Sequence, residues 1–141
     1  MIRVFLDASV IIAALLSPTG GSAKIVRLSK REEIACVVSE TVIFEVEAHT
    51  DKIGKTLTQI AKFIRDNKII VRKRLISSEI EPYLKLVDID DAHVVAGANL
   101  TGCDYLVTLD KKHLLRDDIR QTFYKDIKIV SPKETLEILV D

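Results

Sequence analysis

The chain has 141 residues, of which 48% are hydrophobic and 30% are charged. This composition is typical of a globular protein and excludes disordered, collagen-like and low-complexity classes, so we expect one domain over residues 1–141. Because 21 Lys and Arg residues balance 21 Asp and Glu residues, a uniformly basic surface is excluded, although a local basic patch is not. Aromatic residues make up 5% of the chain, which predicts an aliphatic core.

The two cysteines and the amino-terminal segment indicate a cytoplasmic protein. Cys36 and Cys103 lie in or beside apolar runs, and nothing else suggests a disulfide scaffold, so we expect two reduced thiols. Residues 1–16 resemble a signal peptide in their apolar content, but Asp7 places a carboxylate inside the apolar run. The apolar stretch after Asp7 is shorter than the roughly 20 residues that a membrane-spanning helix needs, so we expect no membrane span.

Apolar runs and capping residues predict strands that alternate with helices. In the first half of the chain, short apolar runs favour strands, and the segments between them have apolar residues at helical spacing. The predicted elements are a strand at Ile2–Leu6, a helix at Ala8–Leu16, a helix at 23–30 capped by Ser22, a strand at Ile34–Val38, a helix from Ser39 to about His49, a helical segment at 52–67 and an edge strand at Ile69–Val71.

The second half of the chain shows the same alternation. Its predicted elements are a short helix opened by a capping box at Ser78–Glu81, a helix at Asp91–Leu100 capped by Asp90 and ended at Gly102, strands at Tyr105–Thr108 and Ile127–Val130, and a final helix to Val140 that the capping box at Ser131–Glu134 opens. Strands joined by helical crossovers predict an α/β fold with a mainly parallel sheet and helices on both faces. In such sheets the ligand crevice lies beyond the carboxyl ends of the strands.

Four acidic residues are expected near this edge of the sheet. Asp7 directly follows the first strand, and Asp110 follows the strand at Tyr105–Thr108 after one intervening residue. Asp91 opens the helix that leads back into that strand. Glu45 lies about one and a half turns into its helix and can lean back toward the strand ends. The alternatives are helix capping for Asp7 and Asp91, a turn for Asp110 and a solvated helix face for Glu45.

The chemistry of such a set depends on a cation. Carboxylates that converge on one spot raise one another's pKa unless a cation neutralises them. Oxygen ligands without cysteine or clustered histidine favour Mg²⁺ or Mn²⁺ over Zn²⁺. Such ions can activate a water molecule and stabilise the leaving oxygen of a phosphodiester. The acid set therefore points to metal-assisted phosphodiester hydrolysis.

Five stretches of the chain, taken in order, resemble PIN domains, the nuclease fold of VapC-type toxins. The resemblance covers almost the whole chain, is closest to the branch described as toxin components of toxin–antitoxin systems, and is more specific as an ordered set than in any single motif. It implies a PIN-like three-layer α/β/α sandwich with a mainly parallel central sheet. The matching stretches are residues 4–18, 38–45, 87–98, 104–115 and 129–132.

The resemblance also implies cleavage of RNA that depends on Mg²⁺ or Mn²⁺. Its expected partners are RNA, a cognate antitoxin protein and a second copy of the chain in a homodimer. The third acid has an alternative, because Asp90 directly precedes Asp91. By position, the family's four acids correspond to Asp7, Glu45, Asp91 and Asp110, and its supporting polar residues correspond to Ser9 and Thr108.

Basic residues suggest where RNA binds. The segment 52–74 holds eight basic residues and one acid, Asp66, which makes Lys62 and Arg65 candidates for RNA binding. Lys111 and Lys112 directly follow Asp110 and are better placed to contact phosphates. The alternative is that these are solvated helix faces. The three histidines form no recognisable metal set, and His93 is expected to face away from Asp91.

Two other functions remain open at this point. One is a catalytically inert RNA-binding or scaffold protein on a PIN fold, against which the complete acid set argues. The other is a phosphatase of the haloacid-dehalogenase type, but the segment Asp7-Ala8-Ser9 lacks the second Asp of that family. A phosphatase would act on phosphomonoesters and spare RNA.

Overall fold

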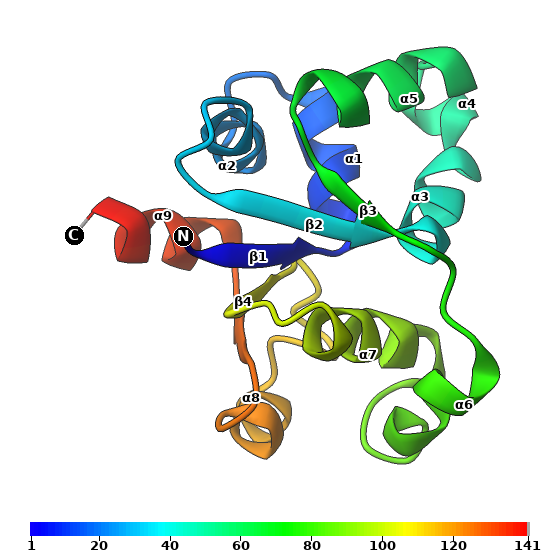
Figure 1. Ribbon diagram of the computed structural model, residues 1–141, viewed down its shortest axis with the longest axis vertical. Helices are drawn as coiled ribbons and strands as arrows, with labels where there is room; N and C mark the ends of the chain where they lie inside the picture. Colours follow the sequence, from blue (N-terminus) through cyan, green and yellow to red (C-terminus); the bar gives the residue numbers. More distant parts are fainter. Residues whose placement is uncertain (141) are drawn as a thin grey trace.

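The computed structural model describes residues 1–140 and shows a three-layer α/β/α sandwich (Figure 1). Its 5-stranded central sheet has the strand order β3-β2-β1-β4-β5, and all neighbouring strands pair in parallel. The predicted mainly parallel sheet is therefore confirmed. The strands are β1 Arg3–Leu6, β2 Ala35–Ser39, β3 Ile70–Arg72, β4 Tyr105–Val107 and β5 Lys128–Val130.

Helices cover both faces of the sheet, because parallel strands need crossover connections. In Figure 1, α1, α2 and α5 lie on one side of the sheet, and α7 and α8 lie on the other. The helices are α1 Ala8–Leu16, α2 Gly21–Lys30, α3 Glu40–Glu47, α4 Thr50–Ile53, α5 Leu57–Asp66, α6 Ser77–Ile80, α7 Ala92–Leu100, α8 Asp117–Phe123 and α9 Pro132–Val140, with 3₁₀ turns η1 Glu81–Tyr83 and η2 Ile89–Asp91.

The largely aliphatic core holds α7 tightly against β1. Val4, Phe5 and Leu6 of β1 are fully buried. A Cβ atom at Gly97 in α7 would lie 2.6 Å from Cζ of Phe5, so glycine is needed for so close an approach. Because α7 returns the chain to the start of β4, its amino end lies at the carboxyl edge of the sheet. The packing thus places Asp91, at that amino end, near the end of β1.

The helical segment predicted at 52–67 is wrong, because two helices and a turn occupy it. Helix α4 ends at Gly54, whose φ of 70° is the left-handed conformation that glycine adopts without strain. Helix α5 then begins after Thr56, whose hydroxyl accepts a hydrogen bond from the Gln59 amide (3.1 Å) while the Gln59 side chain accepts one from the Thr56 amide (2.8 Å). This reciprocal cap fixes a new helix start two residues after Gly54.

Two predicted helix starts are displaced by one or two residues. Helix α2 begins after Gly20 rather than Ser22, and Ser22 is buried in its first turn. Helix α6 is capped at Ile76, two residues earlier than the Ser78–Glu81 pattern suggests, because the Glu79 carboxylate accepts a hydrogen bond from the Ile76 amide (3.0 Å). The start of α2 has no side-chain cap, whereas at α6 the Glu79 carboxylate satisfies the amide of the capping residue Ile76.

The capping box of the last helix is confirmed. The Ser131 amide donates to the Glu134 carboxylate (2.9 Å), and the Glu134 amide donates to the Ser131 hydroxyl (3.1 Å). The Arg120 guanidinium donates to the other carboxylate oxygen of Glu134 (2.9 Å). The hydrogen bond from Arg120, together with those from Ser131, lowers the pKa of Glu134 to about 2. Glu134 therefore ties α8, which carries Arg120, to the start of α9.

Replacing Glu134 with Ala is expected to lower the free energy of unfolding at pH 7 by about 1 kcal/mol, a figure that allows for solvent screening of this partly exposed pair. Because the pKa of Glu134 is lower in the folded state, its stabilisation is present at neutral pH and is lost as the pH falls from about 4.5 toward about 2. Urea unfolding at pH 7 and pH 2.5 measures both effects. Glu137→Ala, exposed on the same helix, is the control, and an equal loss in both variants would contradict this role.

The cysteines and the apolar helices bear on the expected class of protein. Both cysteines are free and buried, and burial raises the pKa of Cys36 to about 12. Within residues 1–140, no single helix is long and apolar enough to cross a membrane, and α1 and α2 pass that test of length and composition only as a pair bent by 97°.

Candidate functional site

Asp7 lies at the point where β1 ends and α1 begins. Its Oδ1 accepts a hydrogen bond from the Ala8 amide (2.8 Å), and its Oδ2 accepts from the hydroxyls of Ser9 (2.9 Å) and Thr108 (2.8 Å). The residue is 8% exposed. Asp7 therefore does stand at the helix cap, as the alternative interpretation held, but its carboxylate is also fixed from the side of β4.

The two hydroxyls connect the ends of β1 and β4. The Ser9 hydroxyl accepts from the Leu109 amide (3.2 Å), and the Thr108 hydroxyl accepts from the Asp110 amide (3.1 Å). Each hydroxyl thus accepts from the chain after β4 and donates to Asp7. The sequence predicted Ser9 and Thr108 as supporting polar residues, and the structure places both in contact with Asp7.

Asp91 and Asp110 face each other across the carboxyl edge, together with a histidine. The Asp110 carboxylate accepts from the His113 amide (3.1 Å), and its Oδ2 lies 3.3 Å from Nδ1 of the His113 ring. The same ring nitrogen lies 3.9 Å from Oδ2 of Asp91. One ligand atom from each of these three residues lies within 4.8 Å of the others, a spacing that could hold a metal ion.

The 3₁₀ turn η2 decides between Asp90 and Asp91. Asp88 caps this turn by accepting a hydrogen bond from the Asp90 amide (3.0 Å), and Asp90 itself is exposed. Asp91 ends the turn with its side chain 16% exposed and directed at the other acids. The predicted capping role of Asp90 is therefore wrong, since the turn before α7 carries Asp90 outward and leaves Asp91 beside Asp110.

Glu45 approaches the same edge from α3 and contacts a second histidine. Its Oε1 lies 2.5 Å from Nε2 of His93, whose side chain is 12% exposed. The sequence predicts that His93 faces away from Asp91, and the structure places its ring against Glu45 of α3, a contact that was not predicted. The Glu45 charge is close enough to Asp7 to contribute to raising its pKa. Glu45 is half-exposed and offers no atom to the group formed by Asp91, Asp110 and His113.

Electrostatics show that these four acids (Asp7, Glu45, Asp91 and Asp110, the carboxylate cluster) are crowded. Burial, and then the charges of Asp110 and Asp7, raise the pKa of Asp91 to about 7. Burial also raises the pKa of Asp7, although its hydrogen bonds with Thr108 and Ser9 oppose the shift. Oδ2 of Asp91 is a buried atom without a hydrogen-bond partner. An orphaned carboxylate oxygen at a site with excess negative charge fits a hard divalent cation.

A comparison with protein families identifies this arrangement. The family model described as PIN domain matches residues 3–112, a range that contains every member of the carboxylate cluster. The chain belongs to the PIN-domain family. PIN domains are generally nucleases, which are hydrolases, and they typically use divalent metal ions. A search of curated proteins found no significant match.

The basic residues predicted to bind RNA lie on two separate parts of the surface of this PIN domain, and several of them are paired with acids. Lys62 and Arg65 are exposed on α5, and Lys62 forms an ion pair with Asp66. The segment 52–74 also has acidic partners elsewhere in the chain, since Lys68 pairs with Glu32 (2.8 Å) and Arg72 with Glu79 (2.5 Å). The sequence could not show these long-range partners. Lys111 and Lys112 are exposed directly after Asp110, at the edge that carries the carboxylate cluster.

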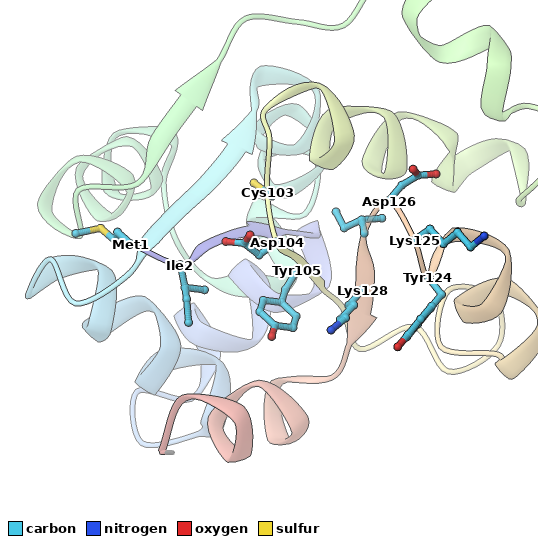
Figure 2. A pocket seen from close by; sticks show the side chains of 10 residues that line it. Met1, Ile2, Cys103, Asp104, Tyr105, Tyr124, Lys125, Asp126 and Lys128 are labelled. Atoms are coloured by element: carbon cyan, nitrogen blue, oxygen red, sulfur yellow. The ribbon is translucent and has the colours of Figure 1, made fainter.

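A hollow of about 600 Å³ lies at the opposite edge of the sheet, near the amino ends of β1 and β4 (Figure 2). Figure 2 shows Ile2, Asp104 and Lys128 among its lining residues. None of the carboxylate cluster lines this hollow. The carboxylate cluster lies instead at the carboxyl edge, where α/β sheets bind ligands.

Sequence reasoning missed the two histidines of the site. His113 follows Asp110 by three residues in a turn, a spacing that lets its amide return to the Asp110 carboxylate. That short spacing is a signal that the sequence does contain. The contact between His93 and Glu45 joins two helices that are far apart in the chain, and no local pattern reveals it.

Proposed function

We propose that this PIN domain is a ribonuclease that hydrolyses RNA phosphodiester bonds with Mg²⁺ or Mn²⁺. The observation that carries the proposal is the convergence of Asp7, Asp91 and Asp110 at one edge, in a chain of the PIN family, with an oxygen of Asp91 that has no hydrogen-bond partner. Crowded carboxylates without a cation are unfavourable, which supports a cation as part of the working site.

The residues around the ion would have different roles in such a site. Asp91 and Asp110 offer oxygens to the ion, and Asp7, held rigidly by its hydroxyl partners, adds a third negative charge. Glu45 closes the site from α3, with His93 restraining its carboxylate. When bound, a divalent ion supplies an activated water molecule and stabilises the leaving oxygen. Lys111 and Lys112 add positive charge beside the cluster, which favours approach of the phosphate backbone.

We further propose that the protein acts as the toxin of a toxin–antitoxin pair, forms a homodimer and works in the cytoplasm. The support is the resemblance of its ordered motifs to VapC-type toxins. Expression in a bacterial host should stop growth, and co-expression of a neighbouring small gene should restore it. Light scattering should give twice the chain mass of 15.8 kDa. Unimpaired growth, or a monomer at micromolar concentration, would contradict the respective part of the proposal.

Metal removal tests the ribonuclease proposal. We expect single-stranded RNA to be cleaved with Mg²⁺ or Mn²⁺ and left intact after chelation, because the proposed mechanism relies on the ion to activate water and to stabilise the leaving oxygen. A phosphomonoester substrate should be spared. Cleavage that survives chelation would contradict the metal mechanism. RNA binding without cleavage under all metals would favour the inert RNA-binding alternative.

Charge reversal tests the predicted RNA-binding residues. The double variant Lys111→Glu/Lys112→Glu is expected to weaken RNA binding at low salt by roughly tenfold or more, because phosphate contacts dominate such affinity. Lys62→Glu/Arg65→Glu should have a smaller effect, since Lys62 is already paired with Asp66. Filter binding of a catalytically inactive background across a salt series measures both, and the salt dependence should become shallower in each variant. Equal affinity in all three proteins would return these residues to the solvated-surface interpretation.

A further inference from the structure

His113 stands on the open side of the carboxylate cluster, where the chain turns after Asp110. Its amide donates to the Asp110 carboxylate (3.1 Å), which fixes the turn and aims the ring at the acids. Nδ1 of the ring faces Asp110 Oδ2 at 3.3 Å and Asp91 Oδ2 at 3.9 Å. The longer of these separations is not a hydrogen bond, and Asp91 Oδ2 has no other partner.

These separations suit a shared ion better than direct contact. Two adjacent ligands, each about 2.1–2.2 Å from an octahedral ion, lie about 3 Å apart, and opposite ligands lie about 4.3 Å apart. The three ligand atoms of Asp91, Asp110 and His113 all lie within 4.8 Å of one another. The ring is therefore as well placed to coordinate an ion as the two carboxylates are.

The other ring nitrogen of His113 supports metal coordination independently, because it also faces a carboxylate. Nε2 of His113 faces Asp88 Oδ2 at 3.7 Å, outside the group of ligand atoms. Histidines that coordinate a metal through one ring nitrogen usually donate the other N–H to a carboxylate, carbonyl or water, which fixes the tautomer. Asp88 is itself held in place because it caps the turn η2. Its carboxylate can therefore accept the Nε2–H of His113.

We propose that His113 coordinates the divalent ion of this PIN domain through Nδ1, and that this nitrogen ligand makes the centre prefer Mn²⁺ to Mg²⁺. The proposal rests on the proposed function, since it needs an ion at the carboxylate cluster. Mg²⁺ takes oxygen ligands and keeps its waters, whereas imidazole nitrogen suits transition-metal ions. Mn²⁺ accepts both kinds of ligand. A site of two carboxylates and one imidazole therefore favours Mn²⁺ more strongly than an all-carboxylate site does.

Electron-spin-echo spectroscopy of the Mn²⁺-loaded protein tests this directly, without any assay of activity. Wild type should show modulation from a directly bound ¹⁴N nucleus. His113→Asn should lose that modulation, whereas His49→Asn, which changes an exposed histidine directly before α4, should keep it. His113→Asn should also weaken Mn²⁺ binding by about 10- to 100-fold, at least the cost of losing an outer partner of a ligand. Mg²⁺ binding, measured by competition, should change by less than about threefold.

Two results would overturn the inference. The variant Asp110→Asn separates a failure of this inference from a failure of the proposed function. If wild type binds Mn²⁺ through Asp110 but shows no ¹⁴N modulation, His113 is not a ligand and only this inference fails. If His113→Asn weakens Mg²⁺ and Mn²⁺ equally, the ring acts through charge or structure instead. If Asp110→Asn leaves Mn²⁺ binding unchanged, no ion occupies the cluster, and the proposed function fails as well. Thermal melting of each variant verifies that the fold is retained.

Discussion

Asp7→Asn is expected to abolish cleavage of single-stranded RNA, with a loss of roughly 10³-fold or more, because an ion's contribution of several kcal/mol depends on the negative charge of the site. The variant should still fold, since Asn keeps the shape of Asp and caps a helix about as well. A residue that served only as a helix cap would tolerate the change with activity intact. Cleavage assays with Mg²⁺ and Mn²⁺, together with thermal melting, measure both consequences.

The hydrogen bonds of Asp7 also predict a small effect on stability. Oδ2 accepts from both Ser9 and Thr108, and each hydroxyl already accepts from a backbone amide. An amide NH₂ group at that position cannot accept, so the variant loses about 1 kcal/mol for each unpaired hydroxyl. Relief of crowding in the carboxylate cluster opposes this loss. We therefore expect a melting temperature within a few degrees of wild type.

Asp126→Asn provides the control, because Asp126 is exposed at the opposite edge, beside the hollow of Figure 2. It should retain full activity. Wild-type cleavage rates in Asp7→Asn would remove this residue from the catalytic machinery. A large loss of folding in the same variant would instead make capping its main role.

Elements that depend on local sequence patterns were predicted well, whereas those that depend on contacts between distant residues were not. All five strands were predicted within one or two residues, because a short apolar run is a local signal of a strand, whether it is buried as in β1 or largely exposed at the edge of the sheet as in β3. Helix α8 was not predicted, and its sequence explains why, since Phe123 is the residue of this short helix that is buried. The break at Gly54 was missed because helical spacing continues on both sides of the turn.

The candidate site divides in the same way. Asp7 and Asp110 were expected at the carboxyl edge because Asp7 directly follows one strand and Asp110 lies a few residues after another, and the structure places both there. The choice between Asp90 and Asp91 depends on the 3₁₀ turn η2, which rotates neighbouring residues to opposite environments and has no signature in the spacing. The contact between His93 and Glu45 was not predicted, because the two residues belong to different helices. Local patterns therefore predict which edge is functional, and tertiary packing decides which side chains meet there.

Asp91→Asn is expected to abolish cleavage and, without metal, to stabilise the protein above neutral pH. The pKa of Asp91 is raised from 3.8 to about 7 by burial and then by the nearby acids. The folded state therefore binds this proton more tightly than the unfolded state does. Its contribution to stability is greatest below pH 4 and is lost as the pH rises through about 7. Asn carries no such charge and escapes that loss.

The comparison at two pH values isolates this one carboxylate. At pH 8 the metal-free variant should be more stable than wild type by about 1–3 kcal/mol, whereas at pH 4 the two should be nearly equal. Asp90→Asn, which changes the exposed neighbour, should leave both stability and activity unchanged. Urea unfolding with chelator present measures these differences. Equal destabilisation of Asp91→Asn at both pH values would show that Asp91 supports the fold through its contacts and not through its charge.

Adding a divalent ion should reverse the order of stability at pH 8. An ion at 100 times its dissociation constant stabilises the folded wild type by about 2.7 kcal/mol, whereas a variant that has lost a ligand binds it more weakly. Wild type should then match or exceed Asp91→Asn in Mg²⁺ or Mn²⁺ and fall below it in chelator. A crowded carboxylate that is costly without metal and favourable with it serves the ion rather than the fold. If added ion shifts wild type and variant equally, Asp91 does not bind it.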